Sequence, residues 1–258
     1  MRIAVLVKQV PDTYGDRKID VSTGLVDRGA GEAVVDEIGE RAVEAALTVR
    51  SAVEGATVTV VSMGPAGAAD GLRRLLAMGA DDGVHVADEG LAGADLTLTA
   101  EVLAAAVRTL GADLVLTGNV STDGAGGVMG ALLAEHLGLP HATNLSALEV
   151  DASKVSGSRV TEAGLVQVEA SLPAVVSVTE ALPDPRLPSF KGIREAKKKQ
   201  VVTLSAAELG ADVAGVGAAR AIVVAAAERP PRAAGVTVVD EGDGGRRLAE
   251  FLIQQNLA

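Results

Sequence analysis

The sequence predicts an α/β protein: a parallel sheet with a mixed edge and helices on both faces, then an antiparallel meander and a C-terminal arm. Two patterns support this fold. Short, continuously apolar runs alternate with longer segments in which apolar residues recur at helical spacing. From about residue 141 the runs become short and partly alternating, which is typical of antiparallel strands. A chain of 258 residues is long enough to bury a full-sized core.

The elements follow one another in a regular rhythm. Strands are expected at 3–7, 57–61, 83–86 and 114–116, and the polar stretch up to Gly31 is expected to form a hairpin or an excursion around Gly24. Asp36 and Asp95 are placed to cap helices, and Pro65 opens another. A strand at 174–178 is expected to rejoin the sheet after the meander at about 141–170.

Composition excludes several classes of function. A formal net charge of −11 argues against a general nucleic-acid binder. No apolar run approaches the roughly 18 residues of a membrane span, so we expect a cytoplasmic protein of a prokaryote and not a membrane protein. The absence of cysteine excludes thiol catalysis and cysteine-ligated clusters. His85, His136 and His141 lack metal-ligand spacing, so no metal site is expected.

A glycine-rich loop follows the strand at 114–116. Residues 124–130 read G-x-G-G-x-x-G, and a helix follows that ends at Gly138. Unpaired N–H groups at such a helix start suit an anion such as phosphate. The motif has Met129 where a dinucleotide fingerprint has Gly or Ala, and no Lys-Ser or Lys-Thr follows. Nucleotide binding and a tight turn with glycines needed only for packing both remain open.

The strand order brings other loops to the same place. In open parallel sheets, ligands bind beyond the carboxyl ends of the strands. Those ends are expected at 6–9, 62–63 and 118–119, so three loops converge on one crevice and favour a nucleotide site. Asp123 could act as a general base or as an acceptor for backbone N–H groups or a ribose. No serine–histidine–acid arrangement is present. We therefore expect binding and no catalytic residues.

Several segments resemble one known family. They are VLVKQVPD at 5–12, DEIGERAVEAA at 36–46, AMGAD at 77–81, LTGN…DG within 116–124, LPAVVSVTE at 172–180 and DPRLPSFKGIREAKKK at 184–199. Together they are similar, in order and over most of the chain, to the electron transfer flavoprotein β subunit. The resemblance implies an adenine-nucleotide α-hydrolase-like (Rossmann-like) domain at residues 1–200. It also implies that the arm at 201–258 packs on a partner subunit.

The resemblance further implies which cofactors are bound. AMP would be held by this subunit, and FAD would be shared with an α subunit that holds most of it. The implied cofactor-binding positions lie on the same three loops: Leu6, Asp36, Glu37, Ile38, Gly39, Met63, Gly118, Asn119, Val120, Ser121, Thr122, Asp123, Gly124, Ala125, Gly126, Gly127, Val128 and Met129. Family members often carry Tyr directly after the position of Asp12, and an aromatic at that of Ile38. Here Thr13 follows, so Thr13 and Tyr14 are both candidates for contact with the flavin.

A stretch rich in proline and lysine at about 180–199 is expected to be irregular, and most of it, about 183–199, forms one segment. By resemblance it is the recognition loop for acyl-CoA and related dehydrogenases, with Phe190 as its anchor. The implied partner-binding residues are Pro188, Ser189, Phe190, Lys191, Gly192 and Ile193. Phe190 could instead be tucked under its own loop. The lysines at 197–199 are either a solvated face or a match for an acidic surface on a partner or on the α subunit.

The resemblance thus implies an electron carrier subunit and not an enzyme. Electrons would pass from dehydrogenases toward the quinone pool through an electron transfer flavoprotein–quinone oxidoreductase. Two alternatives are a stand-alone adenine-nucleotide-binding module and a bifurcating β subunit with a second FAD in place of AMP. A third is an adenylating enzyme of the related pyrophosphatase type. It is disfavoured because this sequence lacks the Ser-Gly-Gly-x-Asp-Ser loop expected of such enzymes.

Overall fold

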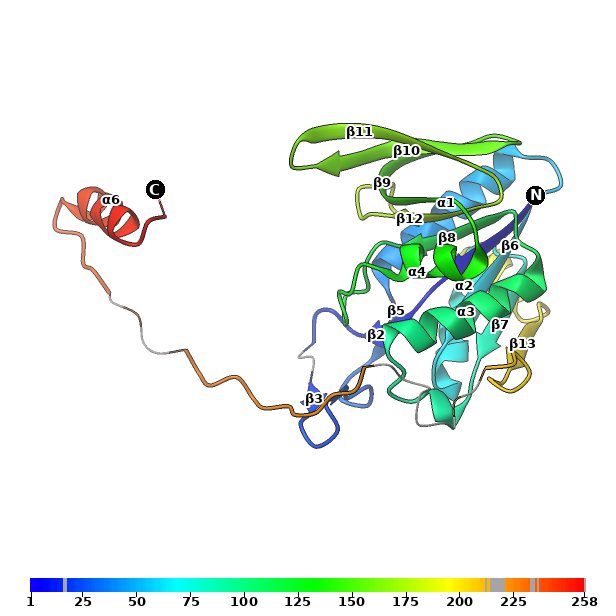
Figure 1. Ribbon diagram of the computed structural model, residues 1–258, viewed down its shortest axis with the longest axis horizontal. Helices are drawn as coiled ribbons and strands as arrows, with labels where there is room; N and C mark the ends of the chain where they lie inside the picture. The colour runs from blue at the N-terminus through cyan, green and yellow to red at the C-terminus, as the bar shows by residue number, and fades with distance from the viewer. Residues whose placement is uncertain (16–17, 212, 214–220, 233–234, 236, 258) are drawn as a thin grey trace. The chain divides into compact units, whose positions relative to one another are not determined.

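The computed structural model describes residues 1–258 except 16–17, 212, 214–220, 233–234, 236 and 258. Within the described residues, a nine-stranded sheet has the order β11-β10-β9-β12-β8-β1-β6-β7-β13 (Figure 1). Every pairing from β9 to β13 in this order is parallel. Both pairings of β10 are antiparallel. The predicted parallel sheet with a mixed edge is confirmed.

The parallel strands are short and mostly apolar, as expected for strands covered on both faces. They are β1 (Arg2–Leu6), β6 (Thr57–Met63), β7 (Asp82–Val86), β8 (Leu114–Gly118), β9 (His141–Val150), β12 (Ala174–Val178) and β13 (Val201–Leu204). The strands expected at 3–7, 57–61, 83–86, 114–116 and 174–178 all occur, with ends that differ by at most two residues. The run at 174–178 does rejoin the main sheet, between β8 and β9.

Four helices follow the strands and begin and end as the sequence indicates. They are α1 (Glu37–Ala52), α2 (Ala69–Met78), α3 (Leu96–Leu110) and α4 (Met129–Leu137). The carboxylates of Asp36 and Asp95 accept hydrogen bonds from N–H groups in the first turns of α1 and α3. Gly111 and Gly138 end α3 and α4 in the left-handed conformation that glycine tolerates best. A 3₁₀ turn, η1 (Ala66–Ala68), leads from Pro65 into α2.

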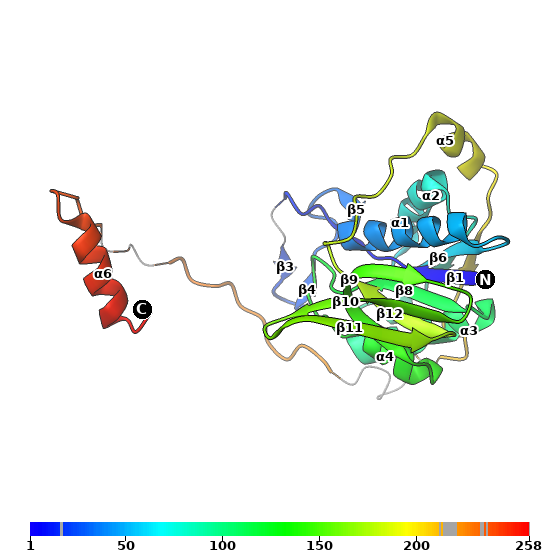
Figure 2. The same ribbon diagram turned by 90° about the horizontal axis from the view of Figure 1, so that it is seen from above.

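Alternate residues of β1 enter two separate cores. Ile3 and Val5 pack in a cluster with residues of α1 and α2. Ala4 and Leu6 pack in a second cluster with residues of α3 and α4. Figure 2 shows these helix pairs on opposite sides of the sheet. The predicted covering of both faces is therefore confirmed, and it leaves the carboxyl ends of the strands along one edge.

The edge beyond β12 is the antiparallel meander. β9 runs parallel to β12 and then pairs with β10 (Lys154–Thr161), which pairs with β11 (Gly164–Ser171). Gly157 on β10 lies so close to β9 that a Cβ there would overlap the carbonyl oxygen of Ala147. The close approach explains a glycine in the middle of a strand.

The polar excursion after β1 contains two small ribbons. One pairs β2 (Gln9–Pro11) with β5 (Ala33–Val35), and the other pairs β3 (Ile19–Asp20) with β4 (Leu25–Val26). Gly24, with φ at 71°, turns the second ribbon, as the predicted hairpin requires.

Two parts of the chain differ from the sequence prediction. The stretch expected to be irregular contains a helix, α5 (Phe190–Ala196). Residues 201–204, expected to begin the arm, form β13 at the end of the sheet, and the first compact unit runs to Ala225. Residues 226–258 form a second unit, which contains the helix α6 (Gly244–Gln254). Residues 212, 214–220, 233–234, 236 and 258 of the predicted arm lie outside the described residues.

The helix α6 carries apolar side chains that its own unit leaves uncovered. None of its residues is buried, and Leu248, Phe251 and Ile253 are more than half exposed. In the part of the chain that the structure describes, no helix combines the length and the apolar character needed to cross a membrane. No group of three or more His, Asp or Glu side chains among the described residues is arranged to hold a metal ion.

Candidate functional site

Asp36 links the first helix to the glycine-rich loop after β8. Its Oδ1 accepts hydrogen bonds from the main-chain N–H groups of Ile38 (3.1 Å) and Gly39 (3.4 Å). Its Oδ2 accepts from both the N–H (2.7 Å) and the Oγ1 (2.8 Å) of Thr122. Asp36 is 2% exposed, so water does not compete for these bonds. One carboxylate thus joins two loops that the sequence assigned to the same crevice.

The end of β8 also approaches the start of α1 closely. A Cβ on Gly118 would lie 3.1 Å from Ile38 Cγ2 and 3.4 Å from the main-chain nitrogen of Gly39. Only a residue without a side chain fits there at ease. Leu6 lies beside Thr117 in the adjacent strand and is buried. The structure therefore brings these predicted residues together, mostly as a floor beneath the loop.

Two methionines border the same floor. Met63, at the end of β6, and Met129, at the start of α4, are partly buried and pack against the core cluster that contains Leu6. Asn119 donates its main-chain N–H to the carbonyl oxygen of Val178, and its side-chain oxygen accepts from Val120. The three strand ends predicted to converge are thus connected by packing and hydrogen bonds.

Asp123 is the buried charge of the loop. Its side chain is 1% exposed, and Oδ1 lies 2.7 Å from Lys8 Nζ while Oδ2 lies 3.5 Å from Arg28 Nη2. Within the described residues, Oδ2 accepts no hydrogen bond. Burial alone would raise the pKa of Asp123, but the hydrogen bond and charge of Lys8 outweigh it, helped by Ser121 and Arg28, and the pKa is lowered. Asp123 is therefore held ionised within the loop.

The lowered pKa predicts how Asp123→Asn changes stability with pH. A carboxyl group with a lowered folded-state pKa stabilises the fold above its unfolded pKa, and this is lost as pH falls through the folded value. We expect the variant to be less stable than the parent by about 1 kcal/mol at neutral pH, because Lys8 and Arg28 are 41% and 42% exposed and partly screened. The gap should close as the solution is acidified. Urea unfolding at several pH values measures it, and a constant gap would contradict the assignment.

The tip of the loop lies at the surface. Residues 124–128 are exposed, and Ala125 and Gly127 have positive φ values of 48° and 68°. No side chain caps α4, and its first internal hydrogen bond is donated by Leu132 to Val128. The main-chain N–H groups of residues 129–131 therefore have no acceptor within the helix. They favour an anionic group at the N-terminus of α4.

The two candidates for flavin contact lie on the excursion after β2. Tyr14, the sole tyrosine of the sequence, is 98% exposed, and Thr13 is partly exposed. The N–H of Tyr14 donates to Asp12 Oδ1 over 3.1 Å. This leaves the aromatic ring uncovered within the chain, and its contact with a flavin remains a prediction.

The segment predicted as a recognition loop is more ordered than its composition suggested. Ser189 caps α5, its Oγ accepting from the N–H of Gly192 over 3.0 Å. Phe190 is the first residue of the helix and is 96% exposed. The alternative in which Phe190 is tucked beneath its own loop is therefore wrong.

Two arginine–carboxylate pairs fix the entrance of this segment to α1. Arg186 binds Glu44 through Nε (2.8 Å) and Nη2 (2.7 Å), a bidentate arrangement. Burial would raise the pKa of Glu44, but the hydrogen bonds and charge of Arg186 outweigh it and lower the pKa. Arg41 donates to Asp184 over 2.6 Å and to the carbonyl oxygen of Leu182. The chain leading to Phe190 is thus attached to α1 on both sides of Pro183 and Pro185.

The end of the segment is fixed to α2 by reciprocal contacts. Arg73 donates to the carbonyl oxygens of Ala196 (3.1 Å) and Lys199 (2.8 Å), while Lys199 Nζ donates to that of Leu76 (3.1 Å). A Cβ on Gly192 would overlap the carbonyl oxygen of Ala77. The helix α5 therefore lies against α2 at a distance that only glycine permits.

We expect Gly192→Ala to displace α5 from α2. The added methyl meets main-chain oxygen, which cannot rotate away, so a loss of about 1–3 kcal/mol is expected. Hydrogen exchange should increase across α5. Gly67→Ala is the matched control, because a Cβ at Gly67 meets nothing within 4 Å. Equal exchange in both variants would contradict the close packing.

The residues that hold these sites in place were not predicted from the sequence. Lys8 and Arg28 at Asp123, and Arg41, Glu44 and Arg73 at the recognition segment, were not predicted. Lys8 directly follows the first strand, which was the one available signal.

Comparisons with known proteins agree with this architecture. The family model described as "Electron transfer flavoprotein domain" matches residues 23–209. The "Electron transfer flavoprotein subunit beta" of Mycobacterium leprae is 47% identical over 262 residues, which cover 99% of this chain and 98% of the relative. The subunit of the same name from Mycobacterium tuberculosis is 46% identical over 99% and 98%, and that of Megasphaera elsdenii is 33% identical over 100% and 98%. The chain therefore belongs to the electron transfer flavoprotein family, as a β subunit that takes part in electron transfer.

Proposed function

We propose that this chain works in a heterodimer, where it holds AMP structurally, forms part of the FAD site at the interface with an α subunit, and docks acyl-CoA-type dehydrogenases. The observation that carries the proposal is the loop at 118–129, joined to α1 by Asp36 and open at its tip. It offers an anion site above a floor of packed residues.

The residues present fit an adenylate. The helix start of α4, free of a side-chain cap, suits the phosphate. Asp123, whose side chain is 1% exposed and paired with Lys8, would fix the shape of the loop around the adenylate. Lys8 Nζ lies beside the loop, 3.4 Å from Ser121 Oγ, and adds positive charge. The remaining proposed contacts would come from the main chain of Leu6, from 36–39 and from Met63.

The flavin would be shared with the α subunit. FAD supplies the redox chemistry when it is bound, and this chain would provide a wall through Thr13 and Tyr14, whose ring is exposed. The arm and the exposed apolar side chains of α6 would pack on the α subunit. The chain would then act as part of an electron carrier with no catalytic side chains of its own.

Docking would use the recognition segment, which includes Pro188, Ser189, Phe190, Lys191, Gly192 and Ile193. A nearly fully exposed phenylalanine on a helix fixed to α1 and α2 is the kind of anchor that fills a partner's pocket. Electrons would then pass toward the quinone pool through an electron transfer flavoprotein–quinone oxidoreductase. We place this activity in the cytoplasm.

Co-expression with an α-subunit gene from the same genome tests the proposal. The purified complex is denatured, and the released nucleotides are separated by chromatography and quantified per heterodimer. Equal amounts of FAD and AMP are expected.

Other outcomes identify the alternatives. FAD released in twice the amount, without AMP, would indicate a bifurcating subunit. A stable colourless monomer that binds adenylate would indicate a stand-alone nucleotide-binding module. Release of neither nucleotide from a folded complex would overturn the proposal.

A further inference from the structure

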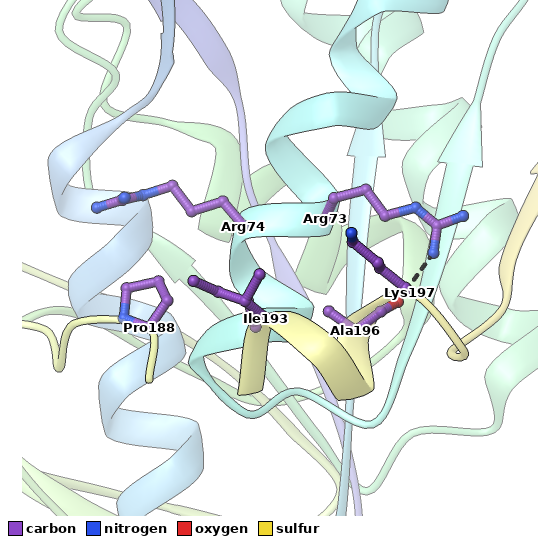
Figure 3. Close-up of a pocket in the computed structure, with 7 residues that line it drawn as sticks. Arg73, Arg74, Pro188, Ile193, Ala196 and Lys197 are labelled. Carbon is purple, nitrogen blue, oxygen red and sulfur yellow. Dashed lines mark hydrogen bonds between the residues drawn. The ribbon is translucent and has the colours of Figure 1, made fainter. Parts of the chain in front are cut away.

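An open groove of about 620 Å³ lies between α2 and α5 (Figure 3). Its walls combine apolar and cationic side chains. The lining residues are Arg73, Arg74, Ala77, Pro188, Ile193, Ala196 and Lys197. It adjoins the recognition segment but is separate from the glycine-rich loop, so the nucleotide site does not account for it.

Each charged side chain that lines the groove is positive. Arg73 is engaged with carbonyl oxygens of the recognition segment, and Arg74 is paired with Glu40 of α1. Lys197 forms no ion pair with any of the described residues. This concentration of positive charge contrasts with the net charge of −11 of the whole chain. A local field of this sign attracts carboxylates.

The groove and the exposed phenylalanine can be reached by one partner segment. Phe190, Ile193 and Lys197 are spaced i, i+3 and i+7, so they lie along one side of α5. Ile193 is 47% exposed and also lines the groove, which places apolar surface between the aromatic ring and the ammonium group. Figure 3 shows Pro188 and Ile193 on one side of the groove and Lys197 toward the other.

We propose that the α2–α5 groove receives an acidic segment of the dehydrogenase that donates electrons. A carboxylate of that segment lies near Lys197, and an adjacent apolar side chain lies on Ile193 and Pro188. This inference rests on the proposed docking function and adds a charge requirement to it. The Phe190 ring is buried in a pocket of the partner. The groove adds specificity, because it favours partners whose carboxylate lies at a fixed distance from that pocket.

The test compares Lys197→Glu with Lys198→Glu in the flavin-loaded complex of both subunits. The two variants change the net charge equally, but Lys198 does not line the groove. Reduction by an acyl-CoA dehydrogenase is followed by stopped flow at several donor concentrations. We expect Lys197→Glu to raise KM roughly tenfold with little change in kcat, and Lys198→Glu to raise it less than about twofold. The difference should shrink in high salt, because exposed charges are screened.

Each other outcome is decisive. An equal rise of KM in both lysine variants would mean that only the overall positive charge of the segment matters. It would overturn the proposal that the groove binds the partner. No shift in either, together with a defect in Phe190→Ala, would overturn the groove and leave the docking function standing. No shift in any of the three variants would overturn the docking function itself. Should Lys197→Glu instead convert a dimer of complexes into single complexes by light scattering, a second copy and not a dehydrogenase occupies the groove.

Discussion

Replacing Phe190 by Ala is expected to lower kcat/KM for reduction of the flavin complex by an acyl-CoA dehydrogenase roughly thirtyfold. Phe190 is 96% exposed, so its ring contributes almost nothing to the fold, and its burial would occur only in a complex. Anchors of this kind contribute about 2 kcal/mol or more to docking, which corresponds to that factor. Stopped-flow reduction under donor-limiting conditions measures it.

The same variant should leave the rest of the protein unchanged. Flavin content and the unfolding midpoint are expected to match the parent, because α5 is held by Gly192, Arg73 and Ser189 and not by the ring. Phe190→Leu keeps an apolar side chain and should recover most of the rate. Equal rates for the parent and Phe190→Ala would remove the anchor role.

The central fold could be predicted because its signals are local. A capping Asp36, a continuously apolar strand and a terminating Gly111 each act within a few residues of their own position. The glycine-rich loop was also visible, since its residues are contiguous. These features follow from backbone chemistry that a short window of sequence contains.

The ordering of the recognition segment could not be predicted in that way. α5 is seven residues long, too short to be stable alone, and proline and lysine around it favour irregular structure. Its stability comes from Arg73, which is 123 residues from Ala196 in the sequence, and from the close approach of Gly192 to Ala77. Such contacts depend on tertiary structure, which spacing alone does not reveal.

The partners of Asp123 were missed for the same reason. Lys8 is 115 residues away in the sequence and comes near only because β1 and β8 are neighbours in the sheet. Arg28 lies on the excursion, where strands of two or three residues gave little signal. The position of the site was predictable from the three strand ends. The ion pairs of Asp123 were not, because they form only in the folded structure.

Asp36→Ala is expected to have the largest effect on the nucleotide site. The change removes four hydrogen bonds at once and leaves the N–H groups of Ile38, Gly39 and Thr122 without that acceptor. Loss of a cap costs about 1 kcal/mol and buried orphan donors cost about 1–3 kcal/mol more, so we expect a total of roughly 3 kcal/mol. The loop would also lose its attachment to α1. The purified complex should therefore contain little AMP.

The variant Asp95→Ala distinguishes the loss of a helix cap from the loss of AMP. Asp95 caps α3 by accepting from the N–H of Leu98 over 2.8 Å, and its other carboxylate oxygen accepts from the N–H of Ala221 over 2.7 Å. It should reduce stability in urea unfolding while AMP content stays near that of the parent. Thr122→Val, which keeps the main-chain donor to Asp36, should cost only about 1 kcal/mol. If both aspartate variants lost stability and AMP equally, Asp36 would be only a helix cap. A selective loss of AMP in Asp36→Ala would mean that one buried carboxylate sets the shape of the nucleotide loop.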